Sequence, residues 1–202
     1  MTDTRMPTRS DRVGIYLSVA IGAVAIGFTA WHAIARLAEV ARGTDIPVLV
    51  PFLGETADLP IGPGGAPVQV AVEQATVTVA EPAAATLFAL WAEPIVIALA
   101  IIAGIVVGAL CCLRLARGRA FERGTARLIF LGTGILAVGW FVGSMLTTMT
   151  VNGALSAVSD YTYDGVTFST DFAPLFGMLA LAAIGAAFQI GERLQRETEG
   201  LV

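Results

Sequence analysis

Residues 94–113 read PIVIALAIIAGIVVGALCCL and contain no formal charge. A helix of about 20 apolar residues matches the hydrocarbon thickness of a bilayer, whereas a surface helix of a soluble protein carries a polar face. Three further stretches are similarly free of charge, apart from the single histidine in the first of them: 13–35, 128–159 and 172–191. Four apolar stretches of this length indicate an integral membrane protein.

Composition agrees with this interpretation. Charged residues make up 14% of the chain, hydrophobic residues 56%, and the mean hydropathy is +0.78, whereas a soluble chain carries about a quarter charged residues. We therefore expect an all-α membrane fold, a four-transmembrane-helix bundle forming one domain over 1–202. The expected helices span about 13–35, 85–113, 126–149 and 172–191. The first of them is too long for the apolar core of a signal peptide, so we expect it to be retained.

The basic residues predict the orientation. All twelve are arginines, and ten of them fall in three segments: 1–12, 114–127 and the tail after Gly191. Arginine in short loops stays on the cytoplasmic side, so both termini are expected inside. The arginine-only, Ala-, Gly- and Val-rich composition resembles a GC-rich bacterial coding bias, and we expect the chain in a bacterial cell membrane. Its acidic pI, about 4.9, argues against direct binding of nucleic acid.

The two expected outer loops, 36–84 and 150–171, carry strand signals. Residues 46–50 predict a short strand, and 68–72 and 75–79 alternate apolar with small or polar residues, which is typical of half-buried strands. Residues 54–65 are rich in Gly and Pro, which predicts turns. In the second loop, Asp164-Gly165 favours a two-residue hairpin turn. We expect both loops to join in one small antiparallel β cap on the extracytoplasmic side.

Small residues recur at four-residue spacing in three of the expected helices. This spacing allows close helix packing in lipid, either inside one bundle or between the copies of a homo-oligomer. The pairs are Gly104 and Gly108, Gly139 and Gly143, and Ala183 and Ala187.

Glu93 and His32 are the candidate functional residues. An acid at membrane depth is costly and therefore suggests a function, but Glu93 follows Trp91 and precedes Pro94, so it can equally lie at the outer interface. His32, the only histidine, lies near the outer end of the first helix, at a similar expected depth. A contact between them would favour a charged imidazole and would form an external proton sensor or relay.

A second candidate site is the arginine-rich link before the third helix. Such a cluster binds anionic membrane lipids or docks a cytoplasmic protein, although the orientation rule alone also explains it. Its members are Arg114, Arg117, Arg119, Arg123 and Arg127.

No motif points to an enzyme. The sequence lacks the signatures of nucleophilic hydrolases, zinc proteases, phosphate-binding loops and dinucleotide-binding folds. Cys111 and Cys112 are adjacent, project in different directions from a helix and have no nearby histidine, so they are expected to be small hydrophobic residues. We expect no catalytic residues, no metal and no cofactor.

Two stretches resemble a known family. Residues 118–128, GRAFERGTARL, resemble its "G-x-P-F, polar stretch, R-L" step, with Ala120 in place of the usual proline, and residues 188–202, FQIGERLQRETEGLV, resemble its C-terminal pattern. The family is the bacterial membrane domain-of-unknown-function family two-nine-seven-five. The resemblance implies four spans with a strand-bearing first outer loop, and a small helix-turn-helix regulator as a cytoplasmic partner. It implies no catalytic residues.

Three functions are compatible with this sequence. The first is a non-enzymatic envelope protein whose outer cap senses or binds a partner and whose bundle signals to a cytoplasmic regulator. The second is a small oligomeric transporter or channel that uses Glu93. The third, a structural assembly protein with the claudin-like layout of four helices under a β cap, rests on fold analogy alone.

Overall fold

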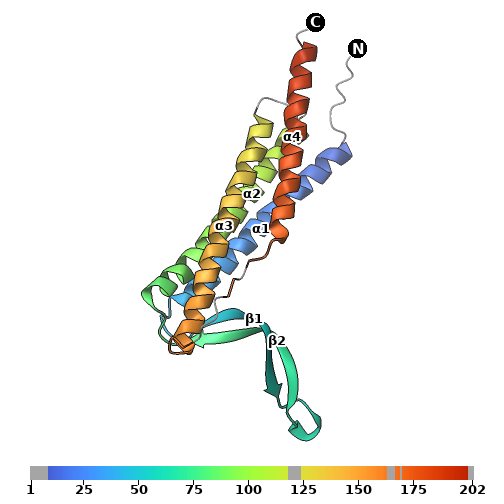
Figure 1. Cartoon of the computed structure of the whole chain (residues 1–202). Helices are drawn as coiled ribbons and strands as arrows, with labels where there is room; N and C mark the ends of the chain where they lie inside the picture. Colours follow the sequence, from blue (N-terminus) through green and yellow to red (C-terminus); the bar gives the residue numbers. More distant parts are fainter. Residues whose placement is uncertain (1–8, 118–123, 163–166, 169, 200–202) are drawn as a thin grey trace. The chain divides into compact units, whose positions relative to one another are not determined.

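The structure is a computed structural model that describes residues 9–117, 124–162, 167–168 and 170–199 (Figure 1). The chain forms four long helices, and one β-hairpin lies between the first and the second of them in the sequence. The elements are α1 (Arg9–Val40), β1 (Ile46–Leu59), the short 3-10 helix η1 (Pro63–Gly65), β2 (Val68–Val79), α2 (Ala84–Ala116), α3 (Thr125–Val158) and α4 (Ala173–Glu199). The chain is thus mostly helical, with a small antiparallel sheet.

All four helices are long and apolar enough to cross a membrane, judged by length and composition. This agrees with a multi-pass membrane protein. The predicted end of the third helix at Met149 is wrong, because α3 continues to Val158. The reason is that Val151, Ala154 and Leu155 recur at helical spacing and are buried, so the helix continues where the prediction placed the start of a loop.

The chain forms two compact units. The helical unit comprises Met1–Ala35, Pro94–Gly143 and Asp171–Val202, and the hairpin unit comprises Arg36–Glu93 and Ser144–Thr170. Helices α1, α2 and α3 contribute residues to both units, whereas α4 belongs to the helical unit alone.

In the helical unit, α2 and α3 approach closely at glycines. A β-carbon placed on Gly139 would overlap the side chain of Ala100, and one on Gly104 would lie 2.8 Å from Leu136 Cδ2. In contrast, a β-carbon on Gly108 would meet nothing within 4 Å, and Ala183 and Ala187 are exposed. Only part of the predicted small-residue pattern therefore serves packing within the chain.

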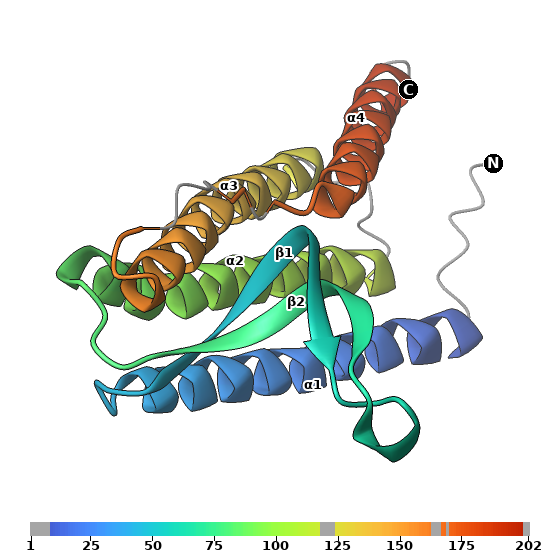
Figure 2. The same ribbon diagram turned by 60° about the horizontal axis from the view of Figure 1, so that its bottom comes forward.

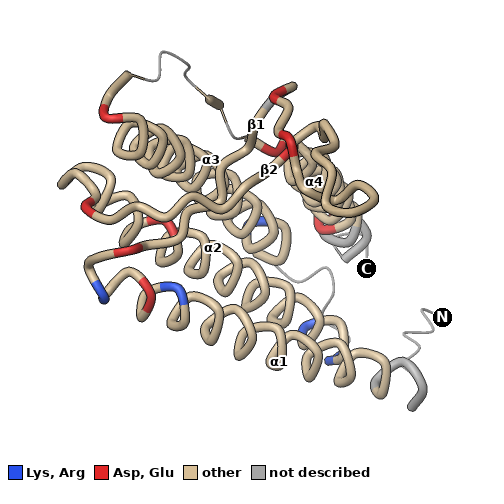
Figure 3. Tube along the Cα trace, turned by 90° about the horizontal axis from the view of Figure 1, so that it is seen from below, with Lys and Arg blue, Asp and Glu red and all other residues tan. Residues whose placement is uncertain are grey.

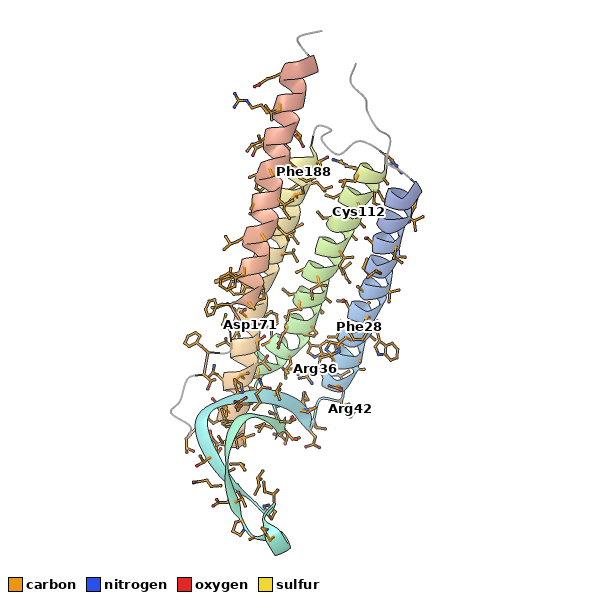
Figure 4. The ribbon with its side chains drawn as sticks, turned by 90° about the vertical axis from the view of Figure 1, so that its right-hand side faces the viewer. Phe28, Arg36, Arg42, Cys112, Asp171 and Phe188 are labelled. Atoms are coloured by element: carbon orange, nitrogen blue, oxygen red, sulfur yellow. The ribbon has the colours of Figure 1, made fainter. Side chains whose placement is uncertain are left out.

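The face of α1 in the helical unit is largely uncovered. Its large apolar side chains are mostly exposed, among them Leu17, Val24, Phe28 and Trp31, and Figure 4 labels Phe28 on this helix. In water such a surface would be unfavourable. It fits a helix that contacts lipid.

In the hairpin unit, β1 and β2 form a two-stranded antiparallel sheet. Its pairing runs from Ile46 opposite Val79 to Leu59 opposite Val68, with an irregularity between Pro51 and Glu55 (Figures 1 and 2). The prediction of turns over 54–65 is therefore wrong for its first half, which is strand. Glycine at 54 marks a bulge inside the strand rather than its end, since Gly54 has a φ of 81°.

The predicted joining of both outer loops in one sheet is not seen in the described residues, where β1 pairs only with β2. The expected Asp164-Gly165 turn lies outside the described residues. The second loop's predicted range instead contributes the end of α3, whose apolar residues pack against the hairpin.

Candidate functional site

The half of the hairpin nearest its ends is built into a core. We call Ile46–Phe52 and Gln74–Val79 the hairpin base. Ile46, Val48, Val50 and Val79 of the base are at most 2% exposed, and they form one cluster with residues from α1, α2 and α3: Val40, Leu90, Val151, Ala154 and Leu155. The alternation along β1 puts one face into this cluster, while Leu49 on the other face is 58% exposed.

The other half of the hairpin, residues 55–72, is named here the arm. Pairing puts Glu55 opposite Val72, Ala57 opposite Val70 and Leu59 opposite Val68. Because side chains alternate along a strand, these three pairs share one face of the ribbon. That face is mainly apolar. Leu59 and Val68, at its outer end, are 43% and 40% exposed, whereas Ala57, Val70 and Val72 are half-buried.

The opposite face of the arm is polar. Asp58 lies opposite Gln69 in the ladder, and Gln69 Nε2 donates a hydrogen bond of 3.3 Å to Thr56 Oγ1. At the tip, Ile61 is 66% exposed next to the 3-10 turn. The arm is therefore an amphipathic ribbon whose apolar face is exposed toward the tip.

The arm and its surroundings are acidic. No lysine, arginine or histidine occurs between Gly43 and Leu113, whereas Glu55, Asp58 and Glu73 are all exposed. Figure 3 shows acidic positions and no basic ones along the two strands. Within the described part of the chain these three carboxylates form no ion pair.

The nearest basic residues in sequence lie at the end of α1, as Figure 4 shows for Arg36 and Arg42. Arg36 Nη1 is 2.9 Å from Glu39 Oε2, so this arginine is already paired. Arg42 is exposed. Because Arg36 is paired with Glu39, it does not neutralise the carboxylates of the arm.

Glu93 is half-buried near the start of α2 and has two hydroxyl partners from α3. Thr147 Oγ1 donates to Glu93 Oε1 at 2.7 Å, and Thr150 Oγ1 donates to Glu93 Oε2 at 3.2 Å. Each carboxylate oxygen therefore accepts one hydroxyl. The group joins α2 to α3 within the hairpin unit, and it lies directly before Pro94, which has no amide hydrogen to donate.

His32 is exposed on α1 in the helical unit, beside Trp31, which is also exposed. Its pairing with Glu93 stays a prediction. The threonine partners of Glu93 were not anticipated from the sequence, because they lie 54 and 57 residues away along the chain.

Asn152 was also missed by the sequence interpretation. Its Nδ2 donates to the carbonyl oxygen of Thr167 at 2.9 Å, and its Oδ1 accepts the amide hydrogen of Thr167 at 2.9 Å. Asn152 Nδ2 also donates to the carbonyl oxygen of Thr148 at 2.8 Å. This side chain thus bonds both the amide and the carbonyl group of one residue in the loop after α3, as a neighbouring strand would. The sequence feature that could have indicated this contact is an asparagine inside an apolar helix.

The arginine-rich link is only partly described, since Arg119 and Arg123 lie outside the described residues. Arg117 and Arg127 are exposed. Arg114 is half-buried, and its Nη1 donates to Thr125 Oγ1 at 3.1 Å. One of the five arginines thus also holds α2 against the first residue of α3.

The start of α3 has a second partner, from α4. Glu192 Oε1 accepts the amide hydrogen of Ala126 at 2.8 Å, which places a carboxylate at the positive end of the helix. Further along α4, Arg193 pairs with Glu197 at 3.0 Å.

The described residues include no group of three or more His, Cys, Asp and Glu placed to hold a metal ion. Cys111 and Cys112 are half-buried free thiols in α2. No protein family, curated protein or solved structure matches this chain.

Proposed function

We propose that the chain is a multi-pass protein of the bacterial cell membrane, with both termini in the cytoplasm and the hairpin unit outside. Four apolar helices of sufficient length support the crossing. The location of ten of the twelve arginines, in the two terminal segments and in the 114–127 link, supports the orientation.

In this orientation the protein is a non-enzymatic receptor or interaction protein of the envelope, and the arm is its binding element. The observation that carries this proposal is the contrast inside one hairpin: the base is packed into a core, whereas the arm exposes an apolar face. An isolated two-stranded ribbon is at best marginally stable in water. A partner that covers the arm would stabilise it.

The signal would leave the membrane at the cytoplasmic ends of the helices. Helices α1, α2 and α3 each contribute to both units without interruption, so a change of packing in the hairpin unit acts on helices that continue across the bilayer. The exposed Arg117 and Arg127 offer contacts for a cytoplasmic regulator. The resemblance to family two-nine-seven-five supports a small helix-turn-helix protein in that role.

The test is a chain with a shortened hairpin. Replacing residues 53–72 by Asn-Gly brings Phe52 opposite Glu73 across a two-residue turn and keeps the base and its core. The transcript profile of cells with this variant is compared with that of cells with the whole chain and of cells without it. We expect the shortened chain to reproduce the profile of the deletion.

Thermal unfolding and membrane extraction of the shortened chain give the control, because both should match those of the whole chain. A shortened chain that is folded and inserted, yet leaves the transcript profile at that of the whole chain, would exclude the arm as the sensing element.

A second candidate function, an oligomeric transporter or channel, is favoured by one observation: a half-buried carboxylate, Glu93, with two hydroxyl neighbours. Ion or proton flux into proteoliposomes that contain the purified chain tests it. A flux that Glu93→Gln abolishes and Asp58→Asn preserves would support transport over sensing.

A further inference from the structure

The two edges of the hairpin differ in their capacity to bind another strand. In the described residues β2 pairs with β1 alone, so about half of the amide and carbonyl groups of each strand point away from the sheet. The free edge of β1 is interrupted, because Pro47 and Pro51 lack amide hydrogens and a bulge follows them.

The free edge of β2 has no such protection. Its twelve residues read VQVAVEQATVTV, without proline and with Glu73 as the single charge. Native sheets usually blunt an exposed edge with lysine, proline, a bulge or a short strand. An edge of this length that lacks these features is a template for strand addition from a partner.

Side chains on the arm would add specificity to that backbone pairing. An added strand would place alternate residues beside Val68, Val70 and Val72, which lie on the apolar face of the arm. An apolar residue at every second position of the partner would cover this face. The partner is therefore an extended segment with alternating apolar residues.

Charge selects among possible partners. The three exposed carboxylates of the arm and bulge, Glu55, Asp58 and Glu73, have no basic residue between Gly43 and Leu113 to neutralise them. A second copy of this chain would bring the same acidic ribbon to the edge, and like charges oppose pairing. A segment whose other residues are lysine or arginine would be attracted.

We propose that the β2 edge of the arm, residues 68–72, takes up an extended basic polypeptide segment from outside the cell as an added strand. This inference rests on the proposed function of the arm and names the chemistry of its partner. The apolar residues of the bound segment face Val68, Val70 and Val72, and its basic residues lie on the opposite face with Asp58 and Glu73. Glu55, at the edge of the apolar face, adds to the negative charge of the ribbon.

The test uses the full chain in phosphatidylcholine nanodiscs and a short fluorescent peptide of alternating valine and lysine. A second peptide has the same sequence with N-methyl groups at alternate residues, which removes edge hydrogen bonding and keeps the charge. We expect the first peptide to bind at least about tenfold more tightly than the second, and than a valine–glutamate peptide. Hydrogen exchange of the β2 amides should slow on binding.

The matched variants separate charge from pairing. The triple variant Glu55→Gln, Asp58→Asn, Glu73→Gln should weaken binding of the lysine peptide by about tenfold or more. The control, Glu39→Gln, removes an acid outside the strands and should leave binding unchanged. Empty nanodiscs measure any binding to lipid.

Three outcomes overturn the inference: equal binding of the N-methylated peptide, full binding by the triple variant, or formation of dimers through the β2 edge without peptide. None of them decides the proposed function, which is tested by the shortened hairpin in cells. If that variant loses the regulatory response while the triple variant retains it, the arm is the sensing element and its partner is not basic.

Discussion

The base and the arm of the hairpin share one pattern and have opposite surroundings. Both alternate apolar residues along their strands, yet Val50 of the base is fully buried and Val68 of the arm is 40% exposed. The base meets residues of α1, α2 and α3, whereas the arm, past the bulge at Gly54, exposes Leu59 and Val68 toward its tip. Period-two alternation thus identifies an apolar face, and it does not tell whether the same chain covers that face.

The largest expected effect comes from placing a charge on each half. Val50→Asp would bury an unpaired carboxylate and should lower the free energy of unfolding of the hairpin unit by at least about 3 kcal/mol. Val68→Asp on the arm should change it by no more than about 0.5 kcal/mol. Denaturation followed by Trp91 fluorescence, in a background without Trp31 and Trp140, measures both. Equal losses would show that the arm is packed as tightly as the base.

The next effect concerns the close approach of α2 and α3 beneath the base. A β-carbon on Gly153 would overlap the side chain of Thr86, which is 5% exposed, so Gly153→Ala should destabilise the hairpin unit by about 1–3 kcal/mol. The same change at Gly108, where the space is open, should be neutral or slightly stabilising. Thr86→Ala added to Gly153→Ala should recover part of the loss. A tolerated Gly153→Ala would contradict the tight contact.

Asn152→Leu removes both hydrogen bonds to Thr167 and should lower the stability of the loop after α3 by about 1–2 kcal/mol. Amide exchange of Thr167 reports it directly, since that amide is one of the two bonded groups. Asn152→Asp keeps the acceptor and should lose less. Unchanged exchange at Thr167 in the leucine variant would mean that the asparagine does not hold this loop.

The smallest effect is expected where the two halves join. Gly54 has a φ of 81°, a conformation that alanine disfavours, so Gly54→Ala should cost about 1 kcal/mol, and Gly54→Asn less. Because the bulge sets the bend between base and arm, peptide binding to the arm should respond more than thermal stability does. If Gly54→Ala lowered thermal stability but left peptide binding unchanged, the bulge would serve the packing of the base and not the position of the arm.

Much of the fold followed from the sequence. Charge-free stretches located all four helices, and alternation located most of the sheet. The errors have physical reasons. The predicted helix ends at Met149, but α3 continues to Val158 because its apolar residues find partners there, as Val151 and Leu155 do. Turns are predicted over 54–65 from the Gly and Pro content of the whole segment, but the glycines and prolines after Gly54 begin only at Pro60, so residues 55–59 form strand.

The candidate site could be predicted from the sequence only in part. Glu93 was singled out from its position between a tryptophan and a proline, but Thr147 and Thr150 are brought to it by the packing of α3 on α2, which no local pattern encodes. The exposed arm was predicted as strand and cap, and its lack of a cover is a tertiary property. The resemblance to a known family stays a prediction.

Glu192 has a consequence for the order in which the protein matures. The first turn of α3 receives its carboxylate from α4, 66 residues further along the chain, so this helix start is incomplete while the ribosome is still making the last span. Helix α4 therefore completes the start of α3. The hydrogen bond to the Ala126 amide can form only after Glu192 has been synthesised.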